Sequence, residues 1–440
     1  MSRKPGTFRG GLHPPDSKAA SADKAVEICP LPDEIIIPLS QHIGAPADPC
    51  VAAGDFVCRG QVVGEAKGFV SVPVHASTSG EVVAVEARPH PSGRDLPAVI
   101  IRPDGRDQWC DDLRGLADDE LAAEPIRNKL RACGIVGLGG ATFPTHVKLS
   151  PPPEKPIDTL IINGAECEPY LTTDYRLMLE EPDRILDGVH LLAAVLGRPR
   201  IFFGIEENKP AAIKVMEAAC ASSDIEVVPL RVKYPQGAEK QLIYAITDRE
   251  VPSGGLPMDV GVLVQNVRTA AAVSVAVRTG QPLIEQVVTV TGPGVAEPKN
   301  LRARIGTPLR HLIESCGGFS GEPGKIILGG PMMGTAQLSL DVPVTRGAGG
   351  LLIFREQDVD PRPEGPCIRC GRCVFVCPAH ILPTTIVAHA RHDQFEAAET
   401  LGVLDCIECG CCTYICPSMI PLVQFIRQAK GAIMAQKRNA

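Results

Sequence analysis

The chain of 440 residues is long enough for several domains, and 44% of its residues are hydrophobic, which is enough to build cores. With 4% aromatic residues and a formal net charge of −7, it has neither the base-stacking platforms nor the basic surface of a nucleic-acid-binding protein. We expect no transmembrane helix, because no stretch of about 18 uncharged apolar residues occurs, and no secretory signal, because the N-terminus lacks an apolar core.

The first quarter of the chain is predicted to be an extended arm followed by short strands. Residues 1–30 are rich in Pro, Gly, Lys and Asp, which is typical of an arm. Residues 31–115 alternate short apolar runs with Gly and Pro turns, as all-β domains do. Residues 53–82 resemble a barrel-sandwich hybrid (biotinyl- or lipoyl-like) fold. No lysine occupies the turn that such domains modify, so we predict a structural role.

Residues 116–285 alternate helices with strands. Helices are expected at 117–132, 182–196, 210–221 and 238–246, and strands at 158–162, 200–205 and 224–232. This alternation predicts a mostly parallel sheet with helices on both faces, which is a Rossmann-like α/β domain.

The C-terminal third is predicted to hold two smaller modules. Residues 286–354 combine strands at 287–291 and 325–328 with a helix near 309–315, as an α+β module does. A charged, Pro-rich linker at 355–365 opens the last module, residues 355–440, with helices expected at 382–403 and 420–436. The last helix has an apolar face, which indicates either docking on a membrane partner or packing over a metal cluster.

Two matched cysteine runs carry the most specific signal in the sequence. Nine of the 17 cysteines lie between Cys367 and Cys416, and this crowding favours metal ligation in a reducing compartment over crosslinks. Each run has the spacing Cys-x2-Cys-x2-Cys-x3-Cys-Pro, which is that of bacterial ferredoxins holding two [4Fe–4S] clusters. In that pattern the fourth cysteine ligates the other cluster. One predicted set is Cys367, Cys370, Cys373 and Cys416, and the other is Cys406, Cys409, Cys412 and Cys377.

Zinc is the alternative interpretation of these cysteines. Zinc sites normally use two Cys pairs separated by a longer loop, so two runs followed by Pro favour iron–sulfur clusters. Gly371 and Gly410 follow the second cysteine of each run, where the backbone must turn, and Cys411 fits neither register.

A glycine-rich loop follows the first helix of the α/β region, with glycines at Gly137, Gly139 and Gly140 and a lysine at Lys148. The dinucleotide fingerprint needs a strand before its glycines, so this loop is not that motif. The glycines would allow close approach of a flat or phosphorylated ligand, but a structural turn explains them equally well.

Two acidic residues come directly after the expected strand at 158–162. In α/β sheets, ligands bind at this end of the strands, so Glu166 and Glu168 are candidates for a binding site. Solvated loop charges are the alternative interpretation.

Four segments of the α/β region resemble the flavin subunit of respiratory complex I. The loop from Gly137 to Lys148 is similar to its FMN loop, and Asn163-Gly-Ala-Glu-Cys-Glu-Pro to its Asn/Asp/Glu segment. Gly237-Ala-Glu-Lys and Gln265-Asn-Val-Arg-Thr are similar to its two later segments. Among the departures, Arg268 stands where that family has Glu.

The whole chain resembles the RnfC family, the peripheral subunits of Rnf membrane complexes. The shared motifs are Phe8-Arg-Gly-Gly-Leu-His-Pro-Pro, His75-Ala-Ser-Thr-Ser-Gly, Tyr234-Pro-Gln-Gly, Val251-Pro-Ser-Gly-Gly-Leu-Pro and both cysteine runs. The resemblance implies an FMN/NADH-binding α/β domain, a soluble-ligand-binding β-grasp (SLBB) module at 286–354, and a helical ferredoxin-like domain with two [4Fe–4S] clusters. It implies NAD(H) as substrate and FMN as the group that links it to the clusters.

Residue roles are also implied by this resemblance. The FMN cradle would comprise Gly137, Gly139, Gly140 and Lys148, with Asn163 at the isoalloxazine or ribityl side and Asn266 and Thr269 at the phosphate end. The residues implied to face the nicotinamide nucleotide are Phe143, Glu166, Glu168 and Glu239.

The implied function is electron transfer between NAD(H), FMN, the clusters and membrane partners, coupled by the complex to ion translocation. The implied partners are a ferredoxin-like Fe–S subunit and membrane flavin subunits, at the cytoplasmic side of a bacterial inner membrane. A soluble cobalamin reductase-like protein is the alternative, although that family lacks the long β-rich N-terminal part and places its clusters earlier. A non-redox scaffold is a further alternative, against which the eight intact cysteines argue.

Overall fold

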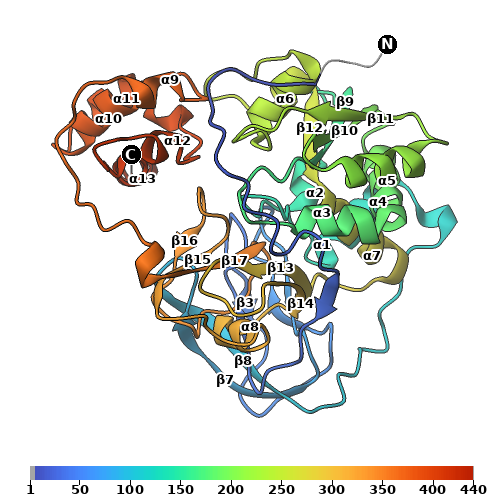
Figure 1. The fold of residues 1–440 in the computed structure, drawn as a ribbon. Helices are drawn as coiled ribbons and strands as arrows, with labels where there is room; N and C mark the ends of the chain where they lie inside the picture. Colours follow the sequence, from blue (N-terminus) through green and yellow to red (C-terminus); the bar gives the residue numbers. More distant parts are fainter. Residues whose placement is uncertain (1–4, 440) are drawn as a thin grey trace.

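The computed structural model describes residues 5–439 and joins two β-rich modules, a parallel α/β layer and a helical C-terminal module (Figure 1). The C-terminal module lies beside the end of the α/β layer that carries helix α6 (Glu239–Thr247). Among the described residues, no helix is both long and apolar enough to cross a bilayer.

The N-terminal module consists of two small sheets around one core. Apolar side chains of both sheets, such as Ile37, Val63 and Ile101, pack together in that core. This arrangement confirms the expected barrel-sandwich fold. One sheet has the order β2 (Ile35–Pro38), β8 (Asp95–Pro103), β7 (Gly80–Pro89), β4 (Phe56–Val57), and the other β3 (Asp48–Pro49), β5 (Val62–Glu65), β6 (Val74–His75).

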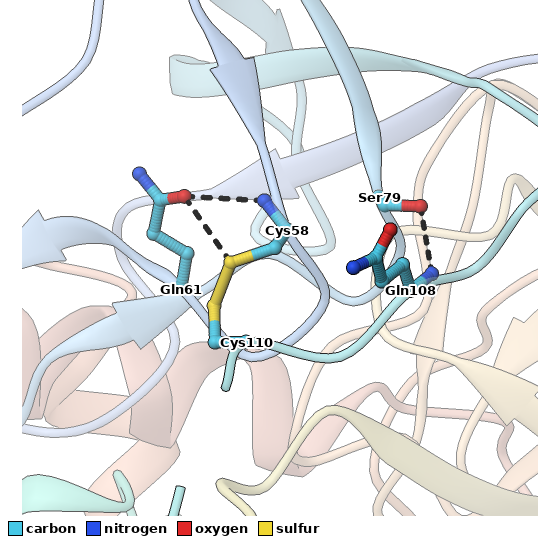
Figure 2. Close-up of a disulfide and its surroundings, with 5 residues drawn as sticks. All are labelled: Cys58, Gln61, Ser79, Gln108 and Cys110. Carbon is cyan, nitrogen blue, oxygen red and sulfur yellow. Dashed lines mark hydrogen bonds between the residues drawn. A yellow bond between two sulfur atoms is a disulfide. The ribbon is translucent and has the colours of Figure 1, made fainter. Parts of the chain in front are cut away.

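A disulfide joins Cys58, after β4, to Cys110 in the segment that follows β8 (Figure 2). The Cys58 N–H donates to Gln61 Oε1 at 3.1 Å, and the Gln108 N–H donates to Ser79 Oγ at 2.9 Å, so both flanks are held. The sequence did not predict this bond, because two isolated cysteines 52 residues apart carry no spacing signal.

The central sheet is parallel throughout and is covered on both faces, as predicted. Side chains alternate along β9, so that Leu160 and Ile162 face one helical layer while Ile161 faces α6. The strand order is β11 (Ile225–Leu230), β10 (Arg200–Glu206), β9 (Thr159–Gly164), β12 (Val262–Asn266). The other layer comprises α1 (Ala123–Ala132), α3 (Thr173–Glu180), α4 (Pro182–Val195), α5 (Pro210–Cys220) and α7 (Val267–Thr279).

The predicted elements of this layer match α1, α4, α5, α6 and β9–β11 within a few residues, except that α1 begins later than expected, at Ala123. Strand β12 and helices α3 and α7 were not predicted. The polar residues Gln265, Asn266 and Arg268 interrupt the apolar residues at the boundary, so no single period spans the change from strand to helix. The change occurs at Asn266, whose side chain caps α7 by accepting a hydrogen bond from the Arg268 N–H at 2.8 Å.

The second β-rich module is a six-stranded mixed sheet with α8 (Leu309–Glu314) packed on it. Its edge strand β1 (Val26–Ile28) comes from the N-terminal arm and pairs in parallel with β14. Part of the extended arm is therefore a paired edge strand of this sheet. The sheet order is β1, β14 (Lys299–Arg304), β13 (Glu285–Thr291), β17 (Gly350–Arg355), β15 (Pro323–Leu328), β16 (Thr335–Ala336).

The C-terminal module is built from α9 (Arg372–Phe375), α10 (Pro383–Ala390), α11 (Phe395–Thr400), α12 (Cys411–Tyr414) and α13 (Leu422–Asn439). The single helix expected at 382–403 is two helices, interrupted where Asp393 takes a left-handed backbone conformation. Helix α13 buries Val423, Ile426 and Ile433 in the core of this module. Its apolar face is therefore internal, which favours the packing interpretation over docking.

Candidate functional site

Polar side chains meet at the carboxyl ends of the neighbouring strands β9 and β12. Asn163 ends β9, and its Nδ2 donates to the Gly237 carbonyl at 2.8 Å. Asn266 ends β12, and its Nδ2 donates to Asp174 Oδ2 at 2.7 Å. The carboxyl ends of parallel strands lie at one edge of the sheet, so both predicted residues come together at the expected binding edge.

The glycine-rich loop folds over the N-terminus of α7. The Leu138 N–H donates to Thr269 Oγ1 at 2.9 Å, and a Cβ on Gly139 would lie 2.7 Å from Asn266 Nδ2, too close for any side chain. A Cβ on Gly140 would meet nothing within 4 Å, so the outer side of the loop is open. The close approach at Gly139 explains one glycine structurally, while the open side at Gly140 leaves room for a ligand.

Two more predicted residues form an ion pair beside this edge. Lys148 Nζ lies 2.6 Å from Glu239 Oε1, and both side chains are partly exposed. Lys148 ends the short helix α2 (Thr145–Lys148), which follows the loop, and Glu239 begins α6. Phe143, within the loop, is half-buried. The structure therefore brings a cation and a carboxylate from distant segments to the open edge.

Glu166 and Glu168 are not solvated loop charges, so that alternative is wrong. The Glu166 carboxylate accepts hydrogen bonds from the backbone N–H groups of Asp174 at 2.6 Å and Tyr175 at 3.2 Å, at the start of α3. The Glu168 carboxylate accepts from the N–H of Met333 at 2.9 Å. Burial raises the pKa of both carboxyl groups, that of Glu168 to about 7. Both are engaged by protein donors, so their contact with a nucleotide stays a prediction.

Several residues that hold this edge together were not predicted from the sequence. Asp174 pairs with Arg268 at 2.7 Å as well as binding Asn266. Lys18, from the N-terminal arm, donates to the Glu168 carbonyl at 2.9 Å, and Lys209 donates to the Ala165 carbonyl at 2.7 Å. Asp174 could have been sought from the sequence, because Arg268 stands where the flavin-subunit family has Glu, and a cation next to the site needs a carboxylate partner.

Five cysteines, including Cys411, line one cavity in the C-terminal module. Four of them are predicted ligands, namely Cys406, Cys409 and Cys412 from the second run and Cys377 from the first. We call these four residues the proximal cysteine set, because this side of the module contacts the α/β layer. The cavity contains the cross-ligating combination that the spacing predicted.

The remaining predicted ligands, Cys367, Cys370, Cys373 and Cys416, are here called the distal cysteine set. Cys367 and Cys370 are exposed. Burial and, to a smaller extent, the neighbouring Cys416 raise the pKa of Cys373. The fourth cysteine of the second run thus lies near the first run, as cross-ligation requires.

The two runs have the same local backbone. Gly371 and Gly410 both take a left-handed conformation, with φ of 72° and 81°, and each precedes a short helix that carries the third cysteine. The left-handed conformation is one that glycine adopts without strain, which explains the glycine after the second cysteine of each run. Cys411 is fully buried among the residues that line the proximal cavity.

Three of the hydrogen bonds that join the proximal side to the rest of the molecule end on backbone carbonyls. The Tyr234 hydroxyl donates to the Cys409 carbonyl at 2.7 Å, and Gln241 Nε2 donates to the Pro378 carbonyl at 3.1 Å. The Gly11 N–H donates to the Val376 carbonyl at 2.8 Å. The donors come from the segment before α6, from α6 itself and from the N-terminal arm.

The residues at both sites suit the groups that the resemblance implies. Eight cysteine thiols in two sets of four are the donor set of two [4Fe–4S] clusters. At the strand ends, the open side of Gly140, the nearby Lys148 and the buried, unpartnered amide of Gln236 suit a phosphorylated ligand with polar edges. Gln236 lies within the Tyr234–Gly237 motif, whose only signal in the sequence is the family resemblance.

Family models match successive parts of the chain. They are the RnfC barrel sandwich hybrid domain over residues 6–106, the Nuo51 FMN-binding domain over 130–275, the SLBB domain over 287–336 and the 4Fe-4S dicluster domain over 362–417. These matches confirm the predicted fold class and the cofactors FMN and two [4Fe–4S] clusters.

Relatives of known function match nearly the whole chain. The C subunit of the proton-translocating ferredoxin:NAD(+) oxidoreductase complex of Clostridium ljungdahlii is 50% identical, over 96% of this chain and 93% of that protein. The corresponding subunit of the Na(+)-translocating complex of Acetobacterium woodii is 48% identical over 100% of both chains. That of the ion-translocating oxidoreductase complex of Rhodobacter capsulatus is 46% identical, over 97% of this chain and 83% of that protein.

A solved structure shares the fold at much lower identity. The NAD+-reducing [NiFe]-hydrogenase in its air-oxidised state aligns with a TM-score of 0.50 and 18% identity, over 71% of this chain and 63% of that chain. The close relatives, by contrast, reach about half identity from end to end, and the chain belongs to the RnfC family of ion-translocating ferredoxin:NAD(+) oxidoreductase complexes.

Proposed function

We propose that this subunit exchanges electrons between NAD(H) and membrane partners through FMN at the strand-end site and through the two cysteine sets. FMN, when bound, links two-electron hydride chemistry to the one-electron chemistry of the clusters. The protein supplies the position and the electrostatic environment of these groups.

The strand-end residues take the roles that their positions allow. The open backbone at Gly140 leaves room for the flavin, Gly139 lets the loop approach Asn266 closely, and Lys148 supplies positive charge for the flavin phosphate. Asn163 is fixed by the Gly237 carbonyl, so its side chain is held at the edge where the ring or ribityl chain would lie. Phe143 and Glu239 are half-buried beside the loop and are the proposed contacts of the nicotinamide nucleotide.

One observation supports the electron route most directly. The segment that precedes and begins α6 touches both sites, because Tyr234 contacts the Cys409 backbone, Gly237 contacts Asn163, and Glu239 pairs with Lys148. Six residues of chain therefore connect the strand-end site with the proximal cysteine set. This connection supports a route in which the proximal set is next to the flavin and the distal set lies farther out.

The distal set is the proposed exit toward partners. Cys367 and Cys370 are exposed, and Ile368 and Phe375 beside them expose 65% and 87% of their surface. Exposed apolar side chains around a redox group suit a protein partner. We infer that a ferredoxin-like Fe–S subunit and membrane flavin subunits exchange electrons with this chain here, at the cytoplasmic side of the inner membrane.

Anaerobic purification followed by titration tests the proposal. We expect flavin and iron to copurify with the chain, and NADH to bleach the cluster absorbance, with NADPH as the comparison. A preparation that cannot bind FMN, and whose iron–sulfur absorbance does not respond to NADH, would contradict it.

A further inference from the structure

Tyr234 is the side chain that couples the strand-end region to a predicted cluster ligand. It is 1% exposed, and its hydroxyl donates to the Cys409 carbonyl at 2.7 Å. The same hydroxyl lies 3.4 Å from Glu168 Oε1. A hydroxyl has one proton, so the shorter contact identifies the Cys409 carbonyl as its main acceptor and Glu168 as the secondary one.

Glu168 is held rigidly in this position. Its two carboxylate oxygens accept from the N–H groups of Met332 at 3.1 Å and Met333 at 2.9 Å, in the loop between β15 and β16. A Cβ on Gly330 in that loop would clash with Glu168 Oε2, so only glycine allows the approach. The carboxylate therefore cannot swing toward solvent without the loop moving.

The surroundings of Tyr234 are apolar and dense. Tyr234 packs with Leu12 of the arm, with Val376, and with Cys409 and Cys411 of the C-terminal module. Charges and dipoles act over longer distances in such an environment than in water, because the local dielectric constant is lower. Burial is also the main reason why the pKa of Glu168 rises to about 7.

We propose that Tyr234 and Glu168 are positioning residues that tune the reduction potential of the cluster held by the proximal cysteine set, with opposite signs. This inference rests on the proposed function, because it assumes a cluster at these cysteines. Reduction adds one negative charge there. The hydroxyl proton directed at the Cys409 backbone stabilises that charge, whereas the buried carboxylate opposes it.

The opposite signs make the inference testable with two nearly isosteric variants, Tyr234→Phe and Glu168→Gln. The measurement is a redox titration of the anaerobically purified full chain, followed by EPR and visible absorbance. Each cluster gives one redox transition, or wave, in this titration. The proximal wave is the one that Cys377→Ser removes, and the wave of the other cluster serves as the internal reference. Tyr170→Phe is the matched control, because the Tyr170 ring packs edge-on against Phe354 in β17 of the second β-rich module.

At a fixed ambient potential, we expect the ratio of reduced to oxidised proximal cluster to fall about threefold in Tyr234→Phe, as loss of one hydrogen bond implies. The ratio should rise about tenfold in Glu168→Gln, because a buried charge is removed. The other wave and the Tyr170→Phe control should not move. If Tyr234→Phe loses iron, the test depends on the shift measured for Glu168→Gln alone, since that substitution retains the shape of the side chain.

Two results would overturn the inference. One is a proximal wave that stays at its wild-type potential in Glu168→Gln, and the other is a shift of both variants in the same direction, as general loosening would produce. If the wild-type chain contains two clusters and flavin, either result rejects only the tuning role. A wild-type chain without clusters would reject the proposed function and this inference together.

Discussion

Exchange of a single fourth cysteine tests how the clusters are held. Cys377 belongs to the first run in sequence, yet its side chain lines the same cavity as Cys406, Cys409 and Cys412. Cys416, its counterpart in the second run, lies near Cys373. Cys377→Ser should therefore remove the proximal cluster, and Cys416→Ser the distal one.

The expected magnitude follows from the ligand sets. Each [4Fe–4S] cluster holds four iron atoms, so each variant should fall from about eight to about four iron atoms per chain. The variants should differ in their response to NADH, because only the proximal set lies beside the segment that reaches the strand-end site. Cys377→Ser should be bleached by dithionite but only slowly by NADH, whereas Cys416→Ser should respond to both.

Iron analysis and stopped-flow absorbance after NADH addition measure these outcomes. Cys411→Ser is the control, because Cys411 is buried at the same cavity but is not a predicted ligand, so it should keep about eight iron atoms. The reasoning is refuted if the NADH responses of Cys377→Ser and Cys416→Ser are reversed. That result would mean that each run fills its own cluster.

Further predictions concern the flavin, the arm and pH. Lys148→Met should weaken FMN binding about tenfold in a fluorescence titration, as loss of a charge-assisted bond to phosphate implies, whereas Lys155→Met, which breaks a pair with Asp259, should not. Gly10→Ala should lower the free energy of unfolding by roughly 2–4 kcal/mol in chemical denaturation, because φ is +75° and a Cβ would lie 2.7 Å from the Cys377 carbonyl. Gly93 has a similar φ of +78° but lies in open space, so Gly93→Ala should lower the free energy of unfolding by only about 1 kcal/mol. Burial, followed by Arg346, lowers the pKa of His75 to about 3, so the unfolded chain binds a proton below about pH 6.5 that the folded chain does not. The wild type should therefore lose about 1.4 kcal/mol per pH unit relative to His75→Gln between pH 6 and pH 4, and equal pH profiles would contradict this.

Local patterns made much of this molecule predictable. The cysteine spacing encodes a turn that the structure repeats twice, down to the left-handed glycines Gly371 and Gly410. Strand–helix alternation predicted the parallel sheet, and the end of β9 predicted a binding edge, whereas Asn266 was expected there only from the family resemblance. Each of these features depends on residues close together in the chain or on a general rule of sheet geometry.

The remaining features depend on contacts between distant segments. Glu168 appeared from its position to be a surface or ligand-facing acid, but its partner Met333 lies 165 residues away. Residues 262–279 follow no single period from which the boundary between β12 and α7 could be located. Neither the contact of Glu168 with Met333 nor the boundary between β12 and α7 can be deduced from the spacing of nearby residues, because contacts between distant segments determine both.

The junction between the α/β layer and the C-terminal module shows why such contacts escape sequence reasoning. Three of the acceptors are the backbone carbonyls of Val376, Pro378 and Cys409, which every residue possesses. A further acceptor is the Asp405 carboxylate, which binds Ser253 Oγ and the Gly254 N–H. Each bond contributes about 1 kcal/mol, so none of them alone fixes the module. Together they hold the backbone at both cysteine turns that supply the proximal set. The spacing between flavin and cluster thus depends on donors from several separate segments, and loss of one donor should alter the electron-transfer rate before it alters the fold.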